Sequence, residues 1–147
     1  MTFLRIALAL AAPSLLLVAT AHASPSVALD SAVFVELAAP QGTRRLEPAT
    51  RLSRGDRVVT VVSWHRLGGE GGFTVTNPLP RKLAYQASAR EDEEVSADGG
   101  RTWGRLGTLK YGARLATPED VTHVRWRIPA GHAARGSGHI AYSGIVR

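Results

Sequence analysis

The chain has 147 residues, 44% of them hydrophobic, a formal net charge of +6 and no cysteine. The absence of cysteine excludes disulfide bonds and lipid attachment through a cysteine, so a hydrophobic core must stabilise the fold. Sixteen of the 18 basic residues are arginine. They are spread along the chain rather than gathered in one segment, which argues against a nucleic-acid partner.

Residues 1–23 have the pattern of a secretory signal peptide. Arg5 supplies a positive charge, residues 6–18 are a short and mostly apolar run, and residues 21–23 (Ala-His-Ala) form a small-x-small cleavage site. The apolar run is too short for a membrane span, and no second run follows it. We therefore expect cleavage after Ala23, a periplasmic or secreted protein, and no membrane span once the signal is removed.

The region after the signal begins with weak strand patterns. Residues 24–30 are expected to be a flexible start, followed by one domain over residues 31–147. Apolar residues alternate at residues 33–37 and predict a first strand. Residues 44–52 form a weaker segment, and Pro48 makes it an edge strand because proline donates no ladder hydrogen bond.

Residues 55–64 have the strongest strand pattern in the chain. The residues that share one face by the two-residue period are Val58, Thr60, Val62 and Trp64. Val59 and Val61 make the opposite face apolar as well. A strand that is apolar on both faces is expected at the centre of a sheet, covered on both sides.

The second half of the chain continues as short strands. A glycine-rich loop at residues 68–72 leads into a strand at residues 73–77, and further strands are expected at residues 83–87, 124–128 and 140–146. The total of seven or eight strands without a helix-period segment predicts an all-β fold, specifically a two-sheet immunoglobulin-like sandwich. Its core is expected to contain Val58, Val62, Trp64, Val124, Trp126 and Ile128.

The order of these segments resembles a known family. The matching elements are Gly55-Asp56-Arg57-Val58, Thr76-Asn77-Pro78-Leu79-Pro80, Tyr85 and the closing segment at residues 136–146. Together they resemble the conserved repeat domain of bacterial surface proteins, domain of unknown function eleven. The resemblance implies an exported immunoglobulin-like sandwich without catalytic residues. Family members usually occur as tandem repeats, whereas this chain holds one copy, which favours a single periplasmic or secreted module.

A second motif lies between two of the strands. The pattern Ser-x-Asp-x-Gly-x-Thr-Trp is similar to the aspartate box of secreted β proteins, and its residues here are Ser96, Asp98, Gly99, Gly100, Thr102 and Trp103. An aspartate in such a turn can accept backbone N–H groups, and glycines tolerate positive φ. We interpret the motif as a structural hairpin, with Trp103 covering its base.

Catalytic and transition-metal sites find little support in the sequence. The histidines beyond the signal are His65, His123, His132 and His139. None forms the tight pair typical of zinc sites, and no Gly-x-Ser-x-Gly nucleophile motif is present. We therefore expect no enzyme activity, no metal site and no cofactor.

Two ligand-binding alternatives remain open. The acidic run at residues 91–94, together with Asp98, could supply calcium ligands, although consecutive acids rarely converge and a solvated edge is the preferred interpretation. Trp103 could stack on a sugar if it were exposed. The leading hypothesis is a non-enzymatic envelope module with a structural or protein-interaction role, whose partner is an envelope protein or a polysaccharide. The alternative is a module that binds a glycan, calcium or a small molecule.

Overall fold

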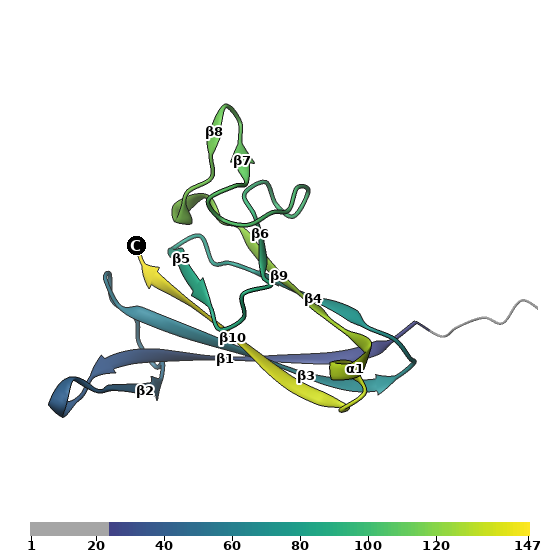
Figure 1. Ribbon diagram of the computed structural model, residues 1–147. Coiled ribbons are helices and arrows are strands. Elements are labelled where there is room, and N and C mark those ends of the chain that lie inside the picture. Colours follow the sequence, from purple (N-terminus) through teal and green to yellow (C-terminus); the bar gives the residue numbers. More distant parts are fainter. Residues whose placement is uncertain (1–23) are drawn as a thin grey trace, which may run out of the picture.

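The computed structural model describes residues 24–147, so the predicted signal peptide lies outside the described part. The described residues form an all-β structure of ten strands (Figure 1). The strands are β1 (Ser26–Ala38), β2 (Arg44–Pro48), β3 (Arg57–Gly68), β4 (Phe73–Pro78), β5 (Leu83–Ser88), β6 (Glu94–Ser96), β7 (Lys110–Tyr111), β8 (Arg114–Leu115), β9 (His123–Ile128) and β10 (Ser137–Val146). Three short helical segments connect them: η1 (Pro40–Gly42), η2 (Pro118–Asp120) and α1 (Ala130–Ala133).

The larger sheet has five strands in the order β2-β1-β3-β10-β5. The valine-rich β3 lies in its middle, antiparallel to both β1 and β10, as expected for the strongest strand pattern. Its side chains alternate, so that one face is buried. The expectation that both faces are covered is wrong, because Val59 and Val61 are only half-buried. These valines face away from the core, and their cross-strand neighbours on β1 are Phe34 and Ala32.

The smaller sheet has three strands in the order β4-β9-β6 and supplies the other half of the core. Its central strand β9 alternates as its sequence predicts, with Trp126 fully buried. The Trp126 indole N–H donates to Ser88 Oγ of the larger sheet at 2.9 Å, and its ring lies 5.8 Å from that of Tyr142. These contacts hold the two sheets together at their centre. All six residues expected in the core are buried: Val58, Val62, Trp64, Val124, Trp126 and Ile128.

The structure corrects the predicted start of the first strand and the predicted number of strands. Residues 26–30, expected to be flexible, are the first residues of β1 and pair with β3. The strand count exceeds seven or eight because β6 has only three residues and the β7–β8 hairpin has two in each strand. Segments this short carry too few residues for a two-residue period to show in the sequence.

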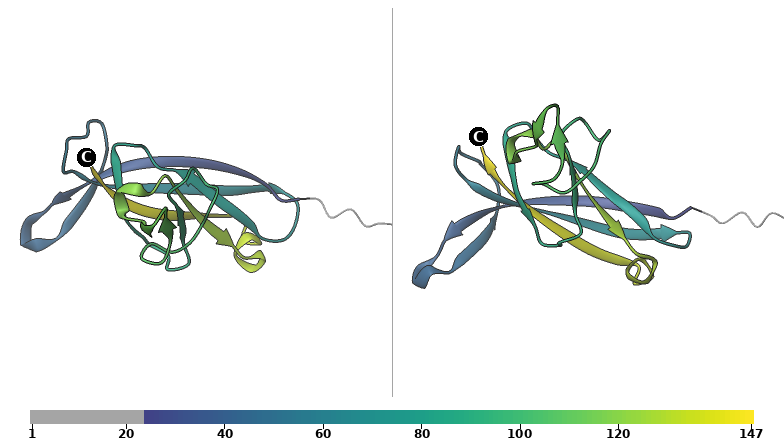
Figure 2. Two further views of the ribbon diagram at one scale, coloured as in Figure 1. Left: turned by 90° about the horizontal axis from the view of Figure 1, so that it is seen from above. Right: turned by 45° about the horizontal axis from the view of Figure 1, so that its top comes forward.

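The two layers differ in extent. The β1–β2 hairpin extends past the smaller sheet at one end of the molecule, and α1 lies at the other end (Figure 2). The smaller sheet leaves part of the core-side face of β1 uncovered: Leu29 and Val33 on that face are 51% and 41% exposed, whereas Val27 packs against the core. Within residues 24–147, no helix is long and apolar enough to cross a membrane.

Candidate functional site

The turn at residues 96–103 is closed by its own hydrogen bonds. Val95 and Gly104 exchange two backbone hydrogen bonds at its base, at 2.8 and 3.1 Å. Asp98 Oδ1 accepts the N–H groups of Arg101 and Thr102 at 3.0 and 2.9 Å, and its Oδ2 accepts the Thr102 hydroxyl at 2.6 Å. The Ser96 hydroxyl also donates to Asp98, at 2.8 Å. These hydrogen bonds, those from Thr102 above all, hold the pKa of Asp98 well below its usual range.

The remaining residues of this motif support the same turn. Gly99 and Gly100 have φ values of 79° and 87°, a region that favours glycine. The Trp103 indole N–H donates to the Gly100 carbonyl at 2.9 Å. The guanidinium of Arg125 lies 4.4 Å from the centroid of the half-buried Trp103 ring and covers one of its faces. All of these contacts are internal, so the geometry favours a structural role for the turn over a sugar-stacking platform.

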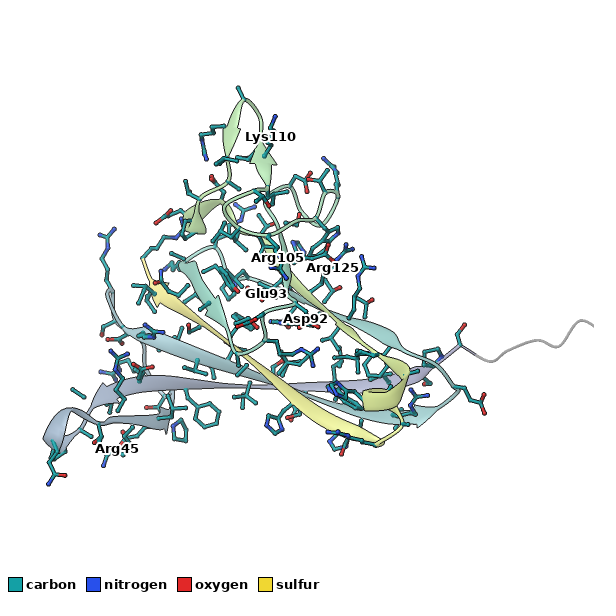
Figure 3. The ribbon with its side chains drawn as sticks, in the orientation of Figure 1. Arg45, Asp92, Glu93, Arg105, Lys110 and Arg125 are labelled. Carbon is teal, nitrogen blue, oxygen red and sulfur yellow. The ribbon has the colours of Figure 1, made fainter. Side chains whose placement is uncertain are left out.

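Asp92, Glu93 and Glu94 of the acidic run have different hydrogen-bond partners, and Figure 3 labels the first two. Asp92 accepts two hydrogen bonds from Arg90, at 2.8 and 2.5 Å. Glu94 accepts from Arg125 at 2.9 Å, and Glu93 accepts from the Tyr85 hydroxyl at 3.3 Å. These hydrogen bonds to arginine lower the pKa values of Asp92 and Glu94. Within residues 24–147, no three acidic or histidine side chains converge as a metal site would require.

The four histidines occupy three different places. His65 lies at the end of β3, and His123 opens β9, with its ring nitrogen 3.1 Å from Thr122 Oγ1. His132 in α1 and His139 on β10 line the same cavity. These two histidines are close in the chain, and the fold adds Trp64, Arg90 and Ile128 from distant segments to the same cavity.

The edge of β1 is the most unusual surface of the described chain. Strand β2 pairs only with residues 34–38, so along residues 26–33 one side of β1 has no neighbouring strand among residues 24–147. The last bond on that side runs from the Ala49 N–H to the Val33 carbonyl at 2.9 Å. Backbone groups of alternate residues point to the same edge, so the N–H and C=O groups of Leu29 and Ser31 belong to the open side. The Ser31 N–H is occupied by the neighbouring Asp30 carboxylate at 2.9 Å.

An apolar groove on the core-side face of the larger sheet meets the open edge at Val33. It has a volume of about 240 Å³, and its lining includes Val33 of β1, Leu52 of the following loop and Leu83 of β5. Leu52 is itself partly exposed. Backbone donors and acceptors therefore lie next to apolar side chains that the domain does not cover.

Sequence reasoning missed this site. The sequence predicts a flexible start at residues 24–30 and a first strand only from residue 33, so the full length of the β1 edge does not follow from it. Strand β1 extends beyond the smaller sheet because of the strand lengths and the strand order. Contacts between residues distant in the sequence determine both.

Comparisons of the chain with family models, with curated proteins and with solved structures found no match. The geometry described above is therefore the basis for assigning a function.

Proposed function

We propose that this protein is an exported, non-enzymatic immunoglobulin-like module of the bacterial envelope. In this proposal it binds a partner protein by accepting an extended segment along β1. The observation that carries the proposal is the open edge at residues 26–33, with its unpaired backbone groups and exposed apolar side chains. The resemblance to the conserved repeat domain of bacterial surface proteins is consistent with such a role.

Strand addition suits this edge for two reasons. Main-chain hydrogen bonds of the added strand supply affinity, and pockets for its alternate side chains supply specificity. Residues 26–33 contain neither lysine nor proline, the residues that commonly protect an exposed edge from pairing. The partner's apolar side chains would lie over Leu29, Val33 and the adjacent groove.

Charge favours a different protein over a second copy of this chain. Asp30 is the one charged residue of the open edge. Pairing two copies of the edge antiparallel to each other would bring two Asp30 side chains close together, which is unfavourable for like charges. A partner segment with lysine or arginine near Asp30 would pair with that carboxylate instead.

The proposal is tested by photo-crosslinking. A photoreactive amino acid replaces Ser31 at the open edge or, as a control, Thr108 near the β7–β8 hairpin, and each protein is irradiated with an envelope extract. We expect a discrete protein adduct from position 31 only, lost in a Leu29→Lys background. Leu115→Lys is the matched control for that loss, since Leu115 is 52% exposed on the hairpin and Leu29 is 51% exposed.

Three results would contradict the proposal. A cross-linked dimer of this chain would replace the partner protein by a second copy. An adduct carrying polysaccharide would replace it by a glycan. Equal adducts from positions 31 and 108 would show that the open edge has no special role.

A further inference from the structure

A second cavity lies at the α1 end of the sandwich, away from the β1–β2 hairpin. Its volume is about 440 Å³, within the range of small-molecule sites. Trp64 of β3, Ile128 of β9 and Ile140 of β10 form its apolar floor. All three are buried, with Trp64 only 4% exposed, so the floor belongs to the core.

Gly138 positions the Trp64 indole at this cavity. Gly138 lies directly across from Trp64 in the β3–β10 pair and lines the same cavity. A Cβ at position 138 would lie 2.6–2.9 Å from indole atoms that include Nε1, so the ring rests on the glycine backbone. The indole N–H groups of Trp103 and Trp126 each have a hydrogen-bond acceptor, whereas that of Trp64 has none within residues 24–147. It is therefore available to an acceptor group on a ligand.

The rim of the cavity is basic. Arg90, His132, Arg135 and His139 line it, and its lining contains no acidic residue. Asp92 holds Arg90 through Nε and Nη2, which leaves Nη1 without a role in that pair. Arg135 makes no ion pair with the acidic residues of the described chain. Arginine is charged at any pH at which the protein folds, so Arg135 gives the rim an uncompensated positive charge that attracts anions, whereas Asp92 balances the charge of Arg90.

Arg66 fixes the loop that carries the histidine and arginine of this rim. Its Nε donates to the Ala133 carbonyl at 3.1 Å, and its Nη1 donates to the Gly69 carbonyl at 2.6 Å. Its backbone N–H donates to the Gly136 carbonyl at 2.7 Å. These bonds connect α1 and the start of β10 to the end of β3. The rim is therefore built on a secured loop.

From this geometry we infer that the cavity binds a small organic anion, with a carboxylate or phosphate group at the arginine rim and a compact ring over the apolar floor. The floor excludes a ligand that is charged throughout, and the basic rim disfavours a neutral one. The cavity lining contains no residue of β1, although Leu29 of the open edge lies across from Trp64 in the β1–β3 pair. The inference assigns a ligand class where the sequence left a small-molecule alternative open.

The test follows the indole N–H signals of the three tryptophans by NMR during titration. The probes are benzoate, glucuronate and inorganic phosphate, with benzyl alcohol and glucose as neutral counterparts. We expect the Trp64 signal to shift saturably with benzoate or glucuronate, at a Kd on the order of 1 mM for so small a ligand. The two organic anions distinguish an aromatic acid from an acidic sugar, and phosphate reports on the oxyanion group alone.

Matched variants locate the binding site. Arg135→Gln should weaken organic-anion binding about tenfold, corresponding to loss of one charge-assisted contact. Arg101→Gln, an exposed arginine of the turn at residues 96–103, should leave it unchanged. Val33→Lys, on the open edge but across from Thr60 rather than Trp64, should leave it unchanged too, which separates this inference from the proposed strand addition. Equal binding of the neutral counterparts, no saturable Trp64 shift with either organic anion, or unchanged affinity in Arg135→Gln would overturn the inference.

Discussion

Within the five-stranded sheet, β1 has an apolar alternation similar to that of β3 and β10, but its core-side face is covered differently. On β3 and β10 the core-facing residues are packed against the three-stranded sheet, and Val62 and Ile140 are almost fully buried. On β1, Leu29 and Val33 face the same way and stay exposed. The difference comes from the second layer, which has too few strands to reach β1. Apolar alternation thus predicts which residues of a strand share one face. Whether that face is buried depends on the element that packs against it.

The largest effect is expected at the centre of the covered side. Trp126→Ala should lower the free energy of unfolding by about 3–5 kcal/mol, because it removes a buried ring and its hydrogen bond to Ser88. Arg127→Ala on the same strand is the control and should stay within about 0.5 kcal/mol, since its side chain is 71% exposed. Urea unfolding measures both variants. Comparable losses would mean that β9 does not divide into a buried and an exposed face.

A matched pair of substitutions compares the two sides directly. Val62→Ala on β3 should cost about 2 kcal/mol, as expected for removing two buried methyl groups. Val33→Ala on β1, which faces the same side of the sheet, should cost less than about 1 kcal/mol. Equal losses in urea unfolding would show that β1 is covered in solution, for instance by a second copy, and dilution would then reduce the loss at Val33.

A smaller effect is expected from the turn at residues 96–103. Its hydrogen bonds lower the pKa of Asp98, so the folded state binds a proton less readily than the unfolded chain does. The stability they contribute is present above the unfolded-state pKa of about 3.9 and is lost as the pH falls further toward the folded-state pKa. Asp98→Asn should lower Tm at pH 7 and flatten the acid-side decline of Tm.

Asp120 limits how much the Asp98→Asn substitution can reduce the loss of Tm at acid pH. Its pKa is also lowered, chiefly by its ion pair with Arg114, so it contributes acid sensitivity of its own. An Asp98→Asn variant with unchanged Tm and an unchanged acid profile would contradict a structural role for the turn. A Tm that rises in millimolar calcium for the wild type alone would indicate a calcium site at Asp98 instead.

Much of the fold was predictable from local patterns. The alternation in β9, the apolar run of β3 and the proline that ends β2 each indicated a strand in the right place. The turn at Asp98 was predictable as well, because its hydrogen bonds join residues within the same short segment.

The candidate sites were not predictable in the same way. Arg90, His132 and Arg135 meet Trp64 at one cavity although they come from separate connections and strands. The open edge of β1 depends on how far β2 pairs along it, and the exposure of its core-side face depends on the extent of the other sheet. Both features arise from long-range pairing, which a single sequence specifies only through the complete fold.

The packing of Trp64 on Gly138 has a consequence for sequence variation. Because any Cβ at position 138 would overlap the indole, alanine or a larger residue there requires a smaller side chain at position 64. Related sequences should therefore show the two positions changing together, with tryptophan at the first only where glycine occupies the second. Gly144 differs, because an added Cβ would lie 2.6 Å from Leu83 Cγ and also 2.8 Å from the backbone oxygen of Ala84, which no smaller side chain relieves. Glycine should therefore be retained at position 144 whatever residue occupies position 83, whereas the residue at position 138 varies with the residue at position 64.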